Sequence, residues 1–414
     1  MHVAVLGAGV IGVTTAYALA KRGCKVTIFD QAGSIAAGAS FANGAQISYS
    51  FVDPMASPAM LKKIPAILLG KDPNIKQKPS LEPAHLRWGA YFLGNCTEPK
   101  ATSNLENAIS LALESRAAFQ DLLTQHSISF RYRQSGKLVV TRNKATLARM
   151  QHAARIKTNS GIEAQSLTAE ECWQVEPKTE PHYRDIVGGI YAPGDYVGDA
   201  RRFTKALSQI CIDDYGVDIR LKQKVFGLAT DGDNVIGVRT GEGVFSADKV
   251  VVCMGAASAK FLSPYNIPLL IEPVKGYSFT IPANDEAPSC SLTDADHKIV
   301  FARLHSEMRI AGLADFDGDD MSLKEDRLAT LKGFAERLLP NIGDYGHSGT
   351  GWVGARPMTP DGLPITRATK VSNLYLNTGH GMLGWTLACG SAERIVEIMM
   401  QQRAGSSQQK RAAQ

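Results

Sequence analysis

The first thirty residues, MHVAVLGAGVIGVTTAYALAKRGCKVTIFD (1–30), decide the fold. A short apolar run (3–6) predicts a strand, and Gly7, Gly9 and Gly12 follow it in a G-x-G-x-x-G pattern. The next residues predict a helix and then a second strand that ends at Asp30. A strand, a glycine turn, a helix, a strand and a terminal acid at this spacing predict a dinucleotide-binding fold.

Each part of this stretch has a physical role in holding a dinucleotide. Gly7 allows a tight turn, Gly9 lets the backbone approach a pyrophosphate, and Gly12 lets the helix and strand pack closely. The first N–H groups of the helix then face the phosphates, and Asp30 accepts hydrogen bonds from a ribose. The predicted contacts are Gly7, Gly9, Val10, Ile11, Gly12 and Asp30.

The same stretch could instead be a targeting segment, because residues 1–20 contain no acid, lysine or arginine. Signal peptides carry their basic residues ahead of the apolar run, whereas Lys21 and Arg22 follow it here. The completed strand–helix–strand unit therefore favours a folded domain. No other run reaches the roughly eighteen apolar residues that span a bilayer.

The composition is that of a globular protein. Of 414 residues, 44% are hydrophobic and 21% are charged, which suits about two domains with substantial cores. The net charge of +5 is spread along the chain, which does not favour nucleic acid but is compatible with an anionic membrane surface. The seven cysteines are scattered, without a CxxC pair, so we expect reduced, buried thiols in a cytoplasmic protein and no metal site.

The predicted elements divide the dinucleotide fold into separate pieces of sequence. Further strands and a helix are predicted within 185–260, and a last strand and helix follow residue 345. A continuous NAD domain would not need its last strand near residue 375. The expected boundaries are 1–50, 185–260 and 345–402 for the dinucleotide-binding domain, 51–184 and 261–344 for an α+β domain with a mostly antiparallel sheet, and 403–414 for a disordered polar tail.

Four further segments contain residues suited to a bound cofactor. SFANGAQIS (40–48) is small and polar, although an ordinary Asn-Gly turn would also explain it. In ADKVVVCMGAASA (247–259), Gly255 lets a backbone come close. GARPMTPDGLPI (354–365) carries an arginine beside a proline, and NTGHGMLGWTLACGSA (377–392) places glycines before a predicted helix.

In order and spacing, these segments resemble those of the D-amino acid dehydrogenase (small-subunit) family, within the FAD-dependent D-amino acid oxidase and glycine oxidase superfamily. The resemblance covers residues 1–400 and is looser at 48–80. The segments that carry it are FANGAQIS (41–48), LRW (86–88), NCT (95–97), PVKGYSFT (273–280), TPDGLPI (359–365) and TGHGMLGWTLACGSA (378–392).

The resemblance implies an α/β fold with a split, Rossmann-like FAD-binding domain of the glutathione reductase type, and FAD as the cofactor. The helix after the GHG loop would direct its N-terminus at the flavin pyrimidine and stabilise negative charge on the reduced flavin. The implied FAD-binding residues outside the N-terminal stretch are Ser40, Asn43, Gly44, Gln46, Val225, Gly255, Gly379, Gly381, Met382, Gly384, Trp385 and Thr386.

The implied reaction is oxidative deamination of a D-amino acid. Hydride leaves Cα for flavin N5, and the imine product hydrolyses to a 2-oxo acid and ammonia. The resemblance also implies that electrons pass to a quinone or another non-oxygen acceptor of the respiratory chain. Three alternatives remain open: an oxygen-using oxidase of the glycine, sarcosine or imino-acid type, a D-hydroxyproline dehydrogenase, and an electron-transfer flavoprotein subunit without its own substrate.

Such a substrate needs a clamp for its carboxylate, and arginine makes a bidentate pair with that group. Arg356 is the first choice, because the resemblance places its loop at the substrate. The other candidates, each with an ordinary explanation as a salt-bridge, core, loop-packing or solvated residue, are Arg309, Arg303, Tyr277, His380 and Lys275.

PAMLKKIPAILLG (58–70) is apolar, carries Lys62 and Lys63, and is too short to span a bilayer. It is either an interfacial anchor that brings the protein to a membrane quinone or a surface helix packed on the second domain. We expect a cytoplasmic protein, with such an anchor placing it on the inner face of the cytoplasmic membrane.

Overall fold

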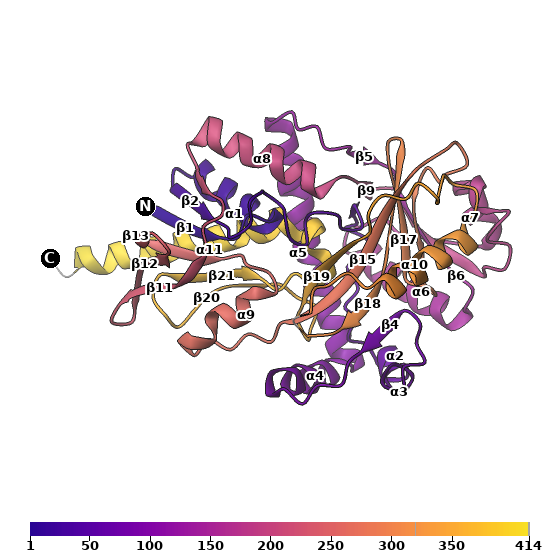
Figure 1. The fold of residues 1–414 in the computed structure, drawn as a ribbon, viewed down its shortest axis with the longest axis horizontal. Helices are drawn as coiled ribbons and strands as arrows, with labels where there is room; N and C mark the ends of the chain where they lie inside the picture. Colours follow the sequence, from indigo (N-terminus) through magenta and orange to yellow (C-terminus); the bar gives the residue numbers. More distant parts are fainter. Residues whose placement is uncertain (319, 413–414) are drawn as a thin grey trace.

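The computed structural model describes residues 1–318 and 320–412, with side chains described as far as residue 401. The chain forms two lobes side by side, each built around its own large β-sheet (Figure 1). The N-terminus lies in the lobe drawn on the left, and the last helix lies along the same lobe.

The first sheet contains the N-terminal strands and is almost wholly parallel. Its strand order is β10-β2-β1-β14-β21-β20, and β20 runs antiparallel to β21. Parallel neighbours need long crossover connections, which the helices supply. The strands are β1 (His2–Leu6), β2 (Lys25–Phe29), β10 (Asp218–Arg220), β14 (Lys249–Val252), β20 (Ile365–Ala368) and β21 (Leu374–Thr378).

Helices cover one face of this sheet, and a small sheet covers the other. Four helices share one buried apolar cluster with the sheet: α1 (Val10–Lys21), α5 (Glu98–Gln125), α8 (Ala200–Tyr215) and α11 (Gly384–Ala412). The opposite face packs against β11 (Val225–Asp231), β12 (Asn234–Thr240), β13 (Gly243–Ser246) and α9 (Ala257–Leu262).

Local sequence sets the ends of these helices. Asp199 accepts a hydrogen bond from the Arg202 N–H at 3.0 Å and so caps α8, as the sequence predicts. The backbone of helix α11 continues beyond its predicted end near Gln401. Its backbone therefore enters the predicted disordered tail (403–414), whose side chains and last two residues lie outside the described part of the chain.

The second sheet follows the order β19-β15-β18-β17-β16-β6-β8-β7, with β4 also paired to β18. It is mostly antiparallel, with parallel pairs at β16–β6 and β18–β4. The strands are β4 (Ile75–Gln77), β6 (Lys137–Thr141), β7 (Gln165–Leu167), β8 (Gly188–Ala192), β15 (Glu272–Pro282), β16 (Ser291–Asp294), β17 (Ile299–Leu304), β18 (Glu307–Phe316) and β19 (Trp352–Met358).

One face of this sheet packs against α7 (Ala169–Val175) and α10 (Glu325–Leu338), which bury Tyr277, Phe279 and Ile281. The loop that follows β2 crosses its other face. The remaining elements are α2 (Pro58–Leu61), α3 (Ile64–Leu68), α4 (Pro83–Asn95), α6 (Lys144–Asn159), β3 (Gln46–Ile47), β5 (Arg133–Gln134), β9 (Tyr196–Val197), η1 (Pro177–Thr179), η2 (Ser263–Tyr265) and η3 (Gly381–Leu383).

The expected domain boundaries differ from these contacts at several elements. Helix α5 comes from the range expected in the second domain, yet its apolar stripe packs on α1 and α11 in the first lobe. Conversely, β8 and β19 come from ranges expected in the first domain but pair within the second sheet. Helical and strand patterns show which residues are buried, but they do not show which lobe buries them.

Candidate active site

The glycine turn after β1 has the geometry that close backbone packing requires. Gly7 has φ +112°, and a Cβ there would lie 2.5 Å from the carbonyl oxygen of Cys253. A Cβ on Gly12 would overlap the carbonyl oxygen of Gly7. Gly9 caps α1, whose first turn carries no acid. The positive end of the helix is thus available to an anion.

Asp30 lies at the end of β2, beside this turn. Its carboxylate accepts hydrogen bonds from the N–H groups of Ala8 and Ala32, at 2.7 Å and 2.8 Å. The acid therefore fixes the turn, and each oxygen keeps a second lone pair for a ligand. Val225, at the start of β11, lies near this acid, since the N–H of Gln223 donates to the Asp30 carbonyl at 2.9 Å.

The loop 40–46 has a specific path across the second sheet. The Val10 N–H donates to Ser40 Oγ at 3.0 Å, which ties the loop to the start of α1. Asn43 Oδ1 accepts from the Ala45 N–H at 3.0 Å, as an Asn-Gly turn would, and Gly44 packs against Val300. The loop 40–46 thus contains the Asn-Gly turn of the alternative interpretation, and it also lies between α1 and the second sheet.

Lys137 is a charged residue at this loop that the sequence analysis missed. Its ammonium donates to Gln46 Oε1 at 3.0 Å and Ser48 Oγ at 3.2 Å, and it lies 4.0 Å from the ring centroid of Phe51. Burial lowers the pKa of Lys137 to about 7, and the charge of nearby Asp195 partly offsets this effect. In the sequence, a lysine at the first position of a strand resembles an ordinary exposed end, so no local signal identified it.

Arg201 was also missed. Its guanidinium lies 3.9 Å from the ring centroid of Phe41, and its buried Nε has no hydrogen-bond partner in the described part of the chain. Arg201 is the second residue of α8 and so brings a cation to the loop from a helix N-terminus.

The GHG loop connects β21 to α11. Gly379 and Gly381 have φ of +74° and +54°, in the region that favours glycine. Gly255, on the adjacent loop, accepts a hydrogen bond from Thr378 Oγ1 at 3.1 Å, and Thr386 Oγ1 accepts from the Ser48 N–H at 3.1 Å. The four predicted loops therefore meet around the N-termini of α1 and α11.

Gly384 begins α11, and two neighbouring side chains point in different directions. Met382 is 52% exposed. Trp385 is buried, and its ring packs on Phe203 while Nε1 donates to the Gly198 carbonyl at 3.1 Å. Aromatic packing with α8 thus turns the Trp385 side chain into the core, and its predicted contact with the cofactor stays a prediction.

Arg356 is a partly buried cation without a paired anion. Its Nη1 donates to the Leu313 carbonyl at 2.7 Å, and no carboxylate of the described residues lies within ion-pair distance. Burial lowers the pKa of Arg356 to about 10, while Asp315 acts in the opposite direction. Since removing a charge from water without a paired anion is costly, this partly buried position suits an anionic ligand.

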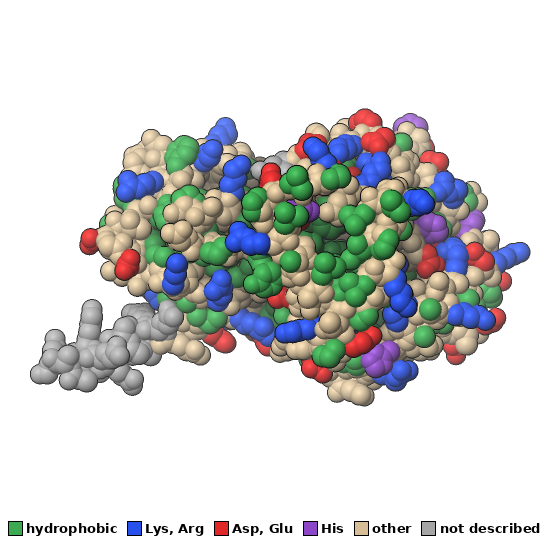
Figure 2. All heavy atoms as spheres, turned by 90° about the horizontal axis from the view of Figure 1, so that it is seen from below, with side chains coloured by type: hydrophobic (Ala, Val, Ile, Leu, Met, Phe, Trp, Pro, Cys, Tyr) green, Lys and Arg blue, Asp and Glu red, His purple; other side chains and the backbone are tan. Residues whose placement is uncertain are grey.

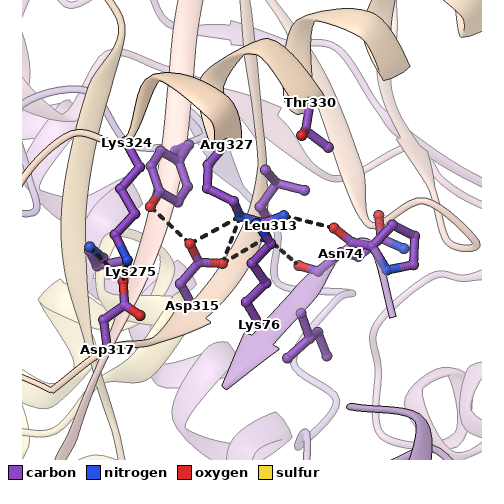
Figure 3. A network of polar contacts seen from close by, with 12 residues as sticks. Asn74, Lys76, Lys275, Leu313, Asp315, Asp317, Lys324, Arg327 and Thr330 are labelled. Atoms are coloured by element: carbon purple, nitrogen blue, oxygen red, sulfur yellow. Dashed lines mark hydrogen bonds and ion pairs between the residues drawn. The ribbon is translucent and has the colours of Figure 1, made fainter. Parts of the chain in front are cut away.

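Tyr277 is not part of this clamp, because it is bonded to the pair of Asp315 and Arg327 that Figure 3 shows. Its hydroxyl donates to Asp315 Oδ2 at 2.9 Å, and Arg327 pairs with the same carboxylate at 2.6 Å. Tyr277 lies on the face of β15 that packs against α10, so it is a core residue, as its alternative explanation expects. Lys275, also in Figure 3, is fully buried and pairs with Asp317 at 2.8 Å.

The remaining candidates have structural partners. Arg309 donates to Thr280 Oγ1 at 2.7 Å and to the Asn43 carbonyl at 3.1 Å, so it supports the loop 40–46. Arg303 donates to the carbonyls of His305 and Ala287, both at 3.2 Å.

His380 is buried and shares a hydrogen bond of 2.8 Å with Ser391 Oγ. Burial lowers the pKa of His380 to about 3, so the ring is neutral near pH 7. His380 is therefore a residue that packs the loop, as its alternative explanation expects. All seven cysteines are buried. Within residues 1–318 and the described side chains beyond, no three His, Cys, Asp or Glu residues are grouped as metal ligands would be.

Comparison with known proteins identifies relatives across almost the whole chain. Residues 2–398 match the family described as FAD dependent oxidoreductase. A D-amino acid dehydrogenase of Vibrio cholerae is 37% identical over 96% of this chain and 95% of its own length. One from Phenylobacterium zucineum is 40% identical over 97% of this chain and 94% of its own length.

Solved structures agree on the fold. Glycine oxidase from Bacillus cereus matches with a TM-score of 0.74 at 22% identity, over 97% of this chain and 95% of its own. L-proline dehydrogenase from P. horikoshii matches with a TM-score of 0.76 at 18% identity, over 97% of this chain and 93% of its own. The predicted α/β fold class and FAD as cofactor are confirmed. This chain belongs to the FAD dependent oxidoreductase family, with D-amino acid dehydrogenases among its relatives.

Proposed function

We propose that this protein is an FAD-dependent D-amino acid dehydrogenase, which oxidises D-amino acids to 2-oxo acids and ammonia. The observation that supports this most directly is the partly buried guanidinium of Arg356, which has no paired anion, in a chain whose relatives at 37–40% identity are D-amino acid dehydrogenases. An electron-transfer subunit without its own substrate would have no use for a partly buried cation that lacks a paired anion.

The residues around the glycine turn would hold the cofactor. The N-termini of α1 and α11 favour negative charge, Asp30 offers its free lone pairs to a ribose, and Lys137 braces the loop 40–46 from the second sheet. Bound FAD supplies the acceptor for hydride from the substrate Cα.

Arg356 would orient the substrate. Its guanidinium can pair with the substrate carboxylate through two charge-assisted hydrogen bonds, which fixes the position of Cα. A substrate amine that binds in its neutral form needs no side chain to remove a proton before hydride transfer. This agrees with the partners of Tyr277 and His380, which are both structural.

We further propose that electrons pass to a membrane quinone and that the protein binds the inner face of the cytoplasmic membrane peripherally. Segment 58–70 forms two short helices with Leu61, Leu68 and Leu69 exposed by 41%, 64% and 70%. The exposed apolar side chains continue beyond this segment at Leu81, Leu86, Tyr91 and Leu93.

We call these seven exposed side chains, on α2, α3 and α4 and the chain between them, the apolar face. Figure 2 shows this side of the molecule, where hydrophobic side chains gather and Lys and Arg side chains lie around them. Apolar side chains among cations favour the surface of an anionic bilayer. Among the described helices, none has the length and apolar character needed to cross a membrane.

An anaerobic flavin-reduction screen over both enantiomers of the amino acids tests the proposed activity. We expect D-amino acids to bleach the flavin of the purified holoenzyme and L-amino acids to leave it oxidised. Equal bleaching by L-amino acids would contradict the proposed stereochemistry. Stopped-flow reoxidation of the reduced enzyme separates acceptors, since rapid hydrogen peroxide formation in air would indicate an oxidase.

A further inference from the structure

A cleft of about 240 Å³ lies between α4 and β20, and part of its lining comes from the segment 354–365. Its lining mixes apolar groups with a few polar ones, as small-molecule sites do. The residues that line it are Tyr91, Asn95, Pro268, Leu269, Leu270, Thr359, Pro360, Asp361, Ile365 and Arg367.

The inner wall of this cleft is the start of the GHG loop. Thr359 and Ile365 both touch Gly379, where a Cβ would lie 2.8 Å from Thr359 Cγ2 and 3.3 Å from Ile365 Cγ1. Because Gly379 has no side chain, these two lining residues pack directly on the backbone of the GHG loop. Electron transfer slows steeply with distance, and this contact places the cleft beside a loop predicted to bind the flavin.

The outer rim of the cleft joins the apolar face. Tyr91 belongs to both, and it is 61% exposed. Arg367 offers an exposed guanidinium, which forms no ion pair within the described part of the chain. The cleft thus opens at the apolar face and presents a hydrogen-bond donor to a ligand inside it.

We propose that this cleft binds the ring of a membrane quinone, an inference that rests on the proposed dehydrogenase function. The apolar face would let the isoprenoid tail remain in the bilayer while the ring enters between Tyr91 and Pro268. Arg367 donates to a quinone carbonyl. The quinone takes up the two electrons and two protons released in the oxidation of the amine, and it becomes the hydroquinone.

Two matched tryptophan variants of the holoenzyme test the site. Pro268→Trp fills the cleft from an exposed loop position, and Pro340→Trp does the same in a separate cavity lined by Pro282, Ala283 and Tyr345. The probes are decylbenzoquinone, for reoxidation of the reduced flavin, and a photoreactive azidobenzoquinone, for covalent labelling followed by peptide mapping. Anaerobic bleaching by a D-amino acid, which needs no quinone, reports the substrate half-reaction.

We expect Pro268→Trp to slow reoxidation by decylbenzoquinone at least tenfold and to remove the label from the peptides that contain Tyr91 and Leu270. Bleaching should stay within twofold of wild type, and Pro340→Trp should change neither measurement. Unchanged reoxidation and labelling in Pro268→Trp would overturn the site while leaving the dehydrogenase function intact. If D-amino acids bleach the wild-type flavin but no quinone reoxidises it, the proposed acceptor fails together with the site.

Discussion

The guanidinium of Arg356 lies against the backbone of Gly276 on the neighbouring strand, so close that a Cβ at position 276 would overlap it. In the register of β15 and β19, Arg356 is opposite Val274, and its side chain extends along the sheet over the next residue of the same face. Gly276 thereby fixes the path of the arginine proposed to hold the substrate.

Arg356→Met should impair the enzyme toward its substrate and leave its cofactor unaffected. The change removes two charge-assisted hydrogen bonds of roughly 1.5–3 kcal/mol each. We expect kcat/KM for D-amino acids to fall on the order of a hundredfold to ten-thousandfold, with normal FAD content and visible spectrum. Arg356→Lys should restore little, because a point charge does not reproduce the fork. Wild-type kcat/KM, or loss of flavin, would place the clamp elsewhere.

Gly276→Ala should displace the Arg356 guanidinium without removing its charge. We expect KM for D-amino acids to rise about tenfold, equivalent to about 1.4 kcal/mol, while FAD content stays normal. Gly333→Ala, in α10, is the matched control because the nearest atom to its Cβ would be 3.7 Å away. An unchanged KM would show that the position of Arg356 does not depend on Gly276.

Asp30→Ala should weaken cofactor binding. The carboxylate orders the glycine turn through Ala8 and Ala32, and it would also accept from the ribose. Loss of these charged hydrogen bonds costs roughly 1–3 kcal/mol of FAD affinity. Fluorescence titration of the apoprotein with FAD measures the change, and Asp231→Ala at the exposed β11–β12 turn serves as control. Equal affinity in the two variants would refute the role of Asp30.

The protonation of Lys137 should make FAD affinity depend on pH. Because its pKa is lowered to about 7, the ammonium loses its charge as pH rises from 6 to 8. A positive charge favours the anionic cofactor, so affinity should fall over this range by threefold to tenfold, or roughly 0.7–1.4 kcal/mol. The Lys137→Met variant should bind FAD weakly at both pH 6 and pH 8. The Lys137→Arg variant should bind FAD equally well at the two pH values. A pH-dependent affinity that persists in Lys137→Met would assign the effect to another group.

Exposed leucines at the apolar face should determine membrane binding. Replacing Leu68 and Leu69 together by Ser removes two of the most exposed apolar side chains of this face. We expect the variant to move from the membrane to the soluble fraction while anaerobic bleaching by D-amino acids is unchanged. The control replaces Ile236 and Val244, exposed by 46% and 56% in the other lobe, by Ser. Unchanged fractionation of the Leu68 and Leu69 variant would show that this face does not bind membranes.

The sequence by itself determined the parts of the fold that depend on neighbouring residues. The glycine spacing, the terminal acid at Asp30 and the cap at Asp199 are local features, and the structure has each where the sequence predicts it. Backbone geometry and hydrogen bonds over a few residues fix such features, so composition and spacing are sufficient to recognise them.

Only the tertiary structure decided which candidate side chains are free to act. Tyr277 turns away from the clamp because Asp315 and Arg327 lie on the opposite face of its strand, and Trp385 turns into the core because Phe203 lies beside it. Lys137 reaches the loop at Gln46 across 91 residues of sequence. A strand shows which residues share a face but not what covers that face, and partners distant in the chain leave no local pattern.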